Sequence, residues 1–132
     1  MCKVGDIILV TEYASEGVNL TRHSFVVLSD EAGKIQGLDY DIVCNVISSF
    51  KSEEQKQKKL KFPGNFPIKA EDKNIPNSRL NVDGYIKAEQ FYYFSKEKTN
   101  YIVIGELSKV VFNVLIEFIQ GLDSIQEIID NL

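Results

Sequence analysis

Residues 22–29 (Arg-His-Ser-Phe-Val-Val-Leu-Ser) constrain the fold more than any other part of the sequence. Apolar side chains in this stretch would occupy both faces of an extended strand, because successive side chains point to opposite sides. A strand with two apolar faces is typical of the centre of a sheet, where both faces are covered. An arginine is not buried without a partner, so we expect Arg22 at the rim of this strand, aimed at a ligand.

Short apolar stretches separated by turn residues predict further strands around this one. We interpret residues 11–21 as a loop of about ten residues, a length that is often functional in a small domain, and residues 30–37 as a turn. Because proline cannot donate to a sheet ladder, residues 66–71 are at best an edge strand. The other predicted strands are residues 7–10, 42–48, 85–92 and 101–104, the last of them ending at Gly105.

The last part of the sequence changes to a helical pattern. Apolar residues recur at spacings of three and four, which predicts a helix over about 106–120 with Gly121 as its C-cap. Its apolar arc is wider than one sheet face requires, so either strands wrap the helix or a second subunit covers part of it. Asp123 or Ser124 could cap a final short helix over about 124–131.

These elements predict a single domain, 1–132, that is mainly β with C-terminal helices (the α+β class). Strands to about residue 105 would form a small curled antiparallel sheet with a helix packed at one end. Apolar residues make up 44% of the chain, which supports a packed core. The two cysteines show neither metal spacing nor a disulfide framework, and no signal peptide or long apolar span is evident. We therefore expect a cytoplasmic protein without membrane contact, metal or cofactor.

The distribution of charge sets limits on partners. A net charge of −4 gives no general attraction to nucleic acid, so any such binding must come from a local patch. Residues 51–61 carry five lysines against two glutamates. This stretch is either a solvated loop or a tract that contacts a phosphate backbone, through Lys56, Lys58 and Lys59.

Four stretches, in the same order along the chain, resemble the MazF/PemK/Kid family of endoribonuclease toxins. They are Val-Gly-Asp with an aliphatic strand at 4–10, Arg22 leading an aliphatic strand, an aliphatic strand ending in a hydroxyl at 43–48, and the strand 85–90 ending in Glu-Gln. The resemblance covers most of the chain up to about residue 105. It implies a small SH3-like antiparallel β-barrel, a homodimer, a cognate antitoxin, and metal-independent cleavage of single-stranded RNA.

Such cleavage needs a base for the 2′-OH proton, an acid for the leaving 5′-oxygen, and positive charge at the phosphate. Arg22 suits the charge role, because a planar guanidinium can hold two phosphate oxygens. Glu89 is the candidate base, and Lys87 would keep it ionised or act as the acid. The resemblance places the catalytic positions at Arg22, Ser48, Lys87 and Glu89. The candidate RNA-binding residues are His23, Ser49, Lys56, Lys58, Lys59, Gln90 and Tyr92.

Each candidate also has an ordinary structural interpretation. Arg22 could form a surface salt bridge, and Lys87 with Glu89 could be a solvated strand face. His23 stands where the family commonly has proline, and Lys87 where the Kid branch has arginine. At least half of the aromatic run 91–94 should face the core, because strand side chains alternate. The alternative function is a non-cleaving relative on the same barrel, such as a gyrase-poisoning CcdB-like toxin or a binding module.

Overall fold

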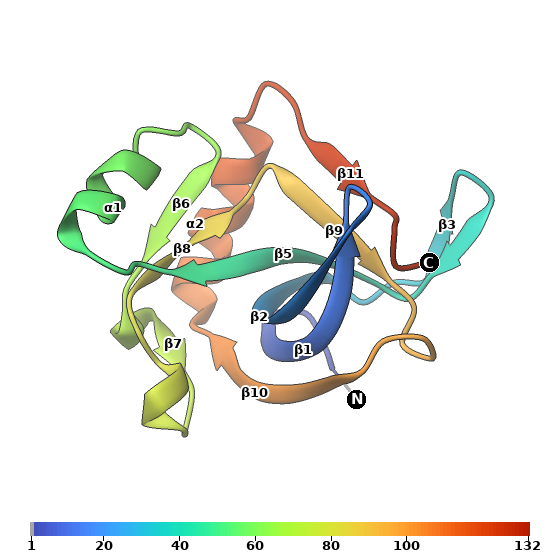
Figure 1. Ribbon diagram of the computed structural model, residues 1–132, viewed down its shortest axis with the longest axis horizontal. Helices are drawn as coiled ribbons and strands as arrows, with labels where there is room; N and C mark the ends of the chain where they lie inside the picture. The colour runs from blue at the N-terminus through green and yellow to red at the C-terminus, as the bar shows by residue number, and fades with distance from the viewer. Residues whose placement is uncertain (1) are drawn as a thin grey trace.

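The computed structural model describes residues 2–132 and shows a chain that is mainly β, with two α-helices in the described part (Figure 1). Helix α1 spans Glu53–Lys59 and helix α2 spans Lys109–Gln120; the 3-10 turns η1 and η2 span Ala70–Asp72 and Ser78–Leu80. The strands are β1 (Asp6–Ser15), β2 (Val18–Ser29), β3 (Gly33–Ile35), β4 (Leu38–Tyr40), β5 (Ile42–Ser49), β6 (Asn65–Ile68), β7 (Lys73–Asn74), β8 (Gly84–Lys87), β9 (Gln90–Phe94), β10 (Tyr101–Leu107) and β11 (Gln126–Ile128). The α+β class predicted from the sequence is confirmed.

One sheet holds nine of these strands in the order β11-β9-β5-β2-β1-β10-β7, with β8 also beside β5 and β6 beside β8. Its pairs are antiparallel except β11 with β9, and β3 with β4 forms a small separate hairpin. Within residues 2–132 the main path of paired strands ends at β11 on one side and at β7 on the other. The sheet is strongly curved (Figure 1), but it is not a closed barrel, because β11 and β7 do not pair with each other.

The predicted central strand is confirmed, because β2 lies between β1 and β5 and its residues Phe25, Val26 and Val27 are fully buried. Alternation along these strands produces two cores, one on each face of the sheet. The first core contains Phe25 and Val27 and is completed by side chains of β9 and β11. The second contains Val26 and is covered by α2, whose Leu115 is fully buried.

Residues 11–21 form the outer half of a long β1–β2 hairpin, so the predicted loop is wrong. Pairing continues to Ser15 opposite Val18, and the turn residues Glu16 and Gly17 both have positive φ, as a two-residue hairpin turn requires. The end of the chain holds this extension in place. The Asn131 side chain pairs with both the N–H and the C=O of Ala14, at 2.7 and 3.0 Å.

The predicted final helix at 124–131 is also wrong, because this segment contains β11, which runs parallel to β9. The Gln126 N–H donates to the Glu89 carbonyl at 2.7 Å, and Ile128 is buried in the first core. Isoleucine is β-branched and suits a strand, and an open edge of the sheet was available to pair with. Gly121 does cap α2, as expected.

Gly105 does not end a strand as predicted, since β10 continues to Leu107 and α2 begins only after its N-cap, Ser108. A Cβ on Gly105 would lie 2.2 Å from the carbonyl oxygen of Asn74. Glycine is therefore needed here because β7 approaches the backbone of β10 closely. The lysine-rich stretch likewise differs from the predicted loop, since Ser52 caps the short helix α1 within it.

The predicted strand 85–92 is interrupted at Ala88 and Glu89, where pairing with β5 passes from β8 to β9. The expected edge segment 66–71 contains most of β6, which pairs only with β8. Asn45, a buried residue of β5, faces this interruption. Its Nδ2 donates to the carbonyls of Gln90 at 2.8 Å and Ala88 at 3.4 Å.

We expect Asn45→Ala to lower the free energy of unfolding by about 1–3 kcal/mol, because it removes the donor that satisfies two carbonyls at this interruption. Urea denaturation of the purified protein measures this change. The matched control is Asn113→Ala at an exposed position of α2, which should change stability by less than about 0.5 kcal/mol. Equal effects of the two substitutions would contradict the role of Asn45.

Candidate functional site

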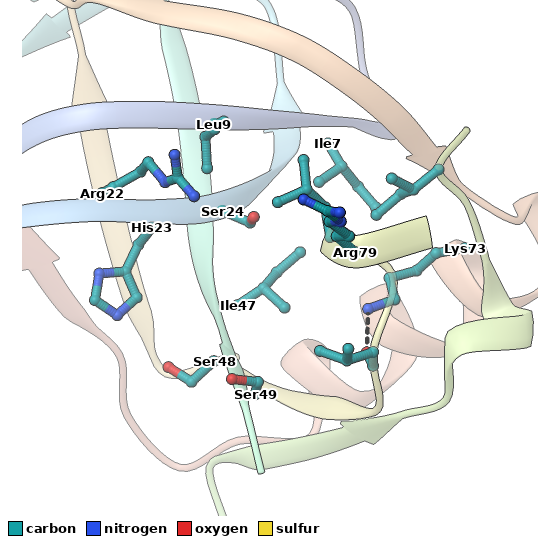
Figure 2. Close-up of a pocket in the computed structure, with 13 residues that line it drawn as sticks. Ile7, Leu9, Arg22, His23, Ser24, Ile47, Ser48, Ser49, Lys73 and Arg79 are labelled. Carbon is teal, nitrogen blue, oxygen red and sulfur yellow. Dashed lines mark hydrogen bonds between the residues drawn. The ribbon is translucent and has the colours of Figure 1, made fainter. Parts of the chain in front are cut away.

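A cationic pocket of about 260 Å³ opens between β1, β2, β5 and the segment 73–82 (Figure 2). We call it the arginine pocket, because Arg22 and Arg79, the two arginines of the sequence, both line it. The third cation is Lys73, and no aspartate or glutamate is among the lining residues. Those residues are Ile7, Leu9, Arg22, His23, Ser24, Ile47, Ser48, Ser49, Lys73, Ile75, Arg79, Leu80 and Val82.

The two arginines carry unbalanced charge. In the part of the chain that the structure describes, the three ion pairs within 4.0 Å all involve lysines, so neither Arg22 nor Arg79 has a carboxylate partner. Both arginines are exposed at the pocket rim. Arg22 lies inside β2, between the exposed hairpin extension and the buried Phe25–Val27 stretch, and not at the start of a strand as expected from the sequence. The alternative of a salt bridge does not hold in this structure. A concave surface that carries only positive charge concentrates its electric field and attracts an anion.

Strand register places the hydroxyl groups around Arg22. The pairing of β2 with β5 reaches Ser24 opposite Ile47. Arg22 comes two residues earlier on β2, and Ser49 comes two residues later on β5, so the two lie opposite each other. They are on the same side of the sheet as Ser24 and Ile47, the side that α2 covers. The same register places His23 opposite Ser48, on the other side of the sheet. The pocket thus lies at the edge where both faces become accessible.

His23 is held through one ring nitrogen. Its Nδ1 lies 3.0 Å from the Thr21 carbonyl oxygen and 3.2 Å from the Tyr13 hydroxyl. Burial raises the pKa of Tyr13 well above its ordinary value, so this hydroxyl keeps its proton. In the tautomer in which Nδ1 carries the proton, Nδ1–H donates a hydrogen bond to the Thr21 carbonyl and Nε2 is the unprotonated ring nitrogen.

Lys73 differs from the other lysines because it is buried, with 8% of its surface exposed. Its ammonium donates to the Val82 carbonyl at 2.6 Å (Figure 2). Burial lowers the pKa of Lys73, while the nearby carboxylates of Asp83 and Asp72 oppose that shift. The bond joins the two ends of the segment that carries η2 and Arg79.

The remaining predicted catalytic residues lie outside the arginine pocket. Lys87 is half-buried on β8, and the Ile47–Ile86 register places it on the same face as Ser48, one strand away. Glu89 is exposed at the β8–β9 interruption, packs over Gly64, and lines a separate hollow with Glu117. Of the four predicted catalytic residues, the structure brings Arg22 and Ser48 together in one pocket and leaves Glu89 in another.

The predicted RNA-binding residues divide in the same way. His23 and Ser49 line the pocket, whereas Tyr92 is 3% exposed in the first core and donates its hydroxyl to Ser15. The prediction that Tyr92 binds RNA is therefore corrected, because its ring is buried. The other four lie elsewhere: Gln90 faces Gln126, Lys56 lies over the Phe50 ring, Lys58 pairs with Glu54, and Lys59 lines an open hollow together with Phe62.

Sequence reasoning missed Ser24, Lys73 and Arg79. Arg79 sits among turn residues and Lys73 follows two acidic residues, so no local pattern marks either one. The signal that could have been used is the scarcity of arginine, with two arginines against thirteen lysines. An arginine in such a chain is a candidate for bidentate recognition, which lysine cannot provide.

We expect Gly84→Ala to destabilise the protein by about 1–3 kcal/mol, because the added methyl would overpack the strand pair that positions Ser48 and Ser49. A Cβ on Gly84 would lie 2.2 Å from the Ser48 carbonyl oxygen. Thermal unfolding measures the effect. The control is Gly121→Ala, where the nearest atom lies at 3.6 Å and the change should be within about 0.5 kcal/mol. An unchanged Gly84→Ala protein would show that these strands can separate freely.

No group of three or more histidine, cysteine, aspartate or glutamate residues in 2–132 has a geometry that could hold a metal ion. Within the same range, no helix has the length and apolarity needed to cross a membrane.

Comparisons with known proteins assign no family. No family model matches the chain, and no solved structure matches it. Sixty residues, 46% of the chain, are 32% identical to part of a citrate (Re)-synthase from Syntrophus aciditrophicus (strain SB). The chain spans only 9% of the length of that enzyme. This similarity is too local to transfer an activity.

Proposed function

We propose that this protein is a metal-independent endoribonuclease that binds and cleaves single-stranded RNA at the arginine pocket. One observation carries the proposal: a concave site gathers both unpaired arginines, three serine hydroxyls and His23 without any carboxylate. Such a donor set favours a phosphodiester over a cationic or neutral ligand. The sequence resemblance to the MazF/PemK/Kid toxins is consistent with it.

In the proposed reaction the ribose 2′-oxygen forms a bond to phosphorus and the bond to the 5′-oxygen breaks. The products are a 2′,3′-cyclic phosphate and a 5′-hydroxyl end. Arg22 holds the phosphate oxygens as negative charge develops, and Ser49, on the same side of the sheet, donates a hydrogen bond to them. Ser48 lies with His23 on the other side, at the edge of the pocket. In the tautomer in which Nδ1–H donates a hydrogen bond to the Thr21 carbonyl, the Nε2 of His23 is unprotonated and takes the 2′-OH proton.

In this scheme the leaving 5′-oxygen takes its proton from Lys87, which is not part of the pocket lining but lies one strand away from Ser48. Lys87 shares the sheet face of His23 and Ser48 and is half-buried. Glu89, the base expected from the sequence, has no part in the scheme within one chain, because it lines a different hollow. The lysines of α1, the helix that follows β5, would contact the phosphate backbone of a longer RNA strand.

The finer structural expectations belong to the same proposal. We infer a MazF/PemK-like assembly in which two copies associate and a cognate antitoxin neutralises them. Exposed apolar side chains on β10 and α2 support an interface there, since Ile102 is 61% and Val110 is 76% exposed. These residues belong to the outer part of the broad apolar arc of α2 and to the neighbouring strand.

A digest of single-stranded RNA in the presence of EDTA tests the proposal. Fragments mapped at nucleotide resolution should carry 2′,3′-cyclic phosphate and 5′-hydroxyl ends, and an all-DNA strand of the same sequence should stay intact because it lacks the 2′-OH. RNA that binds without being cut would favour a non-cleaving binding module. An absence of both binding and cleavage would remove the proposal altogether.

A further inference from the structure

The segment 73–82 forms one wall of the arginine pocket, and several contacts fix its conformation. It contains β7, Ile75 buried in the second core, and η2 with Leu80 packed against the same core. Asn77 caps η2 by accepting the Arg79 N–H at 3.1 Å. Arg79 therefore stands on a capped turn, with apolar anchors on both sides of it.

The buried bond from Lys73 to Val82 closes this segment. Lys73 Nζ donates to the Val82 carbonyl at 2.6 Å, and Val82 itself is exposed, so its own side chain does not anchor the segment. A second bond, from the Ala70 N–H to the Asp83 carboxylate at 2.8 Å, fixes the chain just beyond it. Burying a lysine is costly unless its ammonium is hydrogen-bonded, and here the ammonium donates to a backbone carbonyl at the pocket wall.

We propose that Arg79 is a second phosphate-binding residue of the site and that Lys73 is a positioning residue that holds Arg79 over the pocket. The proposal deepens the RNA-binding function above and rests on it. Two guanidinium groups on opposite walls, one from β2 and one from η2, would grip one phosphodiester from two sides. Lys73 acts through the loop that it closes, and Arg79 contacts the RNA.

Binding of a fluorescein-labelled 2′-O-methyl oligoribonucleotide tests this, because the blocked 2′-oxygen prevents cleavage. We expect Arg79→Ala to weaken binding about tenfold and to reduce the slope of log affinity against log salt by about 0.7, the value for one lost contact to a single strand. The control Lys34→Ala removes a positive charge from the separate β3–β4 hairpin and should leave both quantities unchanged.

The positioning role requires a double-mutant cycle. Lys73→Met keeps an apolar stem and removes the bond to Val82, so it should weaken binding in the wild-type background. It should have no further effect in the Arg79→Ala background. Lys73→Arg keeps a donor and should retain most of the affinity. A purely structural role would lower the melting temperature without this dependence on Arg79.

The outcomes separate this inference from the proposed function. If Arg22→Ala leaves affinity unchanged, RNA binding at the pocket is wrong and both proposals fall. If Arg22→Ala weakens binding while Arg79→Ala does not, only the second phosphate contact is overturned. Additive effects of Lys73→Met and Arg79→Ala would overturn the positioning role alone. If Lys73→Met does not fold, Lys73→Arg replaces it in the test. Retained affinity in a folded Lys73→Arg protein supports the positioning role. A loss of affinity as large as that of Arg79→Ala overturns it.

Discussion

Replacing Arg22 by alanine is expected to lower kcat/KM for cleavage of single-stranded RNA by about 10²–10³, the loss that follows removal of one preorganised charge-stabilising donor. Arg22 lines the pocket, has no carboxylate partner, and lies on β2 just before the buried Phe25–Val27 stretch. Its guanidinium is therefore free to hold the phosphate as charge develops. Initial rates on a labelled oligoribonucleotide measure the change.

A graded series sharpens the test of Arg22. Arg22→Lys keeps the charge but loses the planar fork, so its rate should lie between those of the wild type and the alanine variant. Lys34→Ala, which removes an exposed charge on β3, should retain full activity. Because Arg22 is exposed, none of these changes should alter the melting temperature. An Arg22→Ala protein with wild-type rates would contradict the site.

Replacing His23 by asparagine is expected to lower kcat by about 10²–10⁴, the usual contribution of a general acid or base. The asparagine amide can still donate to the Thr21 carbonyl in place of Nδ1, whereas the atom assigned to proton transfer, Nε2, is lost. Binding of the 2′-O-methyl oligoribonucleotide should be nearly unchanged. A fall in kcat at constant affinity is the pattern expected of a group that acts in the chemical step.

Glu89→Gln provides the comparison for His23→Asn, since it neutralises the carboxylate without changing its size. Glu89 lines a hollow with Glu117, outside the arginine pocket, so the variant should cleave RNA at the wild-type rate. If Glu89→Gln lost as much activity as His23→Asn, the base would be Glu89, delivered to the RNA by an assembly of two chains. The two variants thus choose between the histidine of the pocket and the carboxylate expected from the sequence.

The differences between sequence expectation and structure share a physical cause. Residues 11–21 have no periodic apolar pattern because the β1–β2 extension faces solvent on much of its surface, yet Asn131, more than a hundred residues away, pairs with Ala14 and stabilises it. The segment after residue 123 has helix-compatible spacing, but the free edge of β9 offered hydrogen bonds that a short isolated helix lacks. Both outcomes depend on partners distant in sequence.

The sequence by itself determined the elements with strong local patterns. Two-sided apolar character identified β2 as a central strand, and the helical spacing with Gly121 identified most of α2, because burial demands such periodicity from the chain itself. Only the tertiary structure decided which charges meet. Lys73 and Arg79 reach the wall opposite Arg22 because β7 pairs with β10 and the Lys73–Val82 bond closes the segment. Glu89 lies in the interruption between β8 and β9, opposite Asn45, and lines a different hollow. Such long-range pairing leaves no local signature in a sequence.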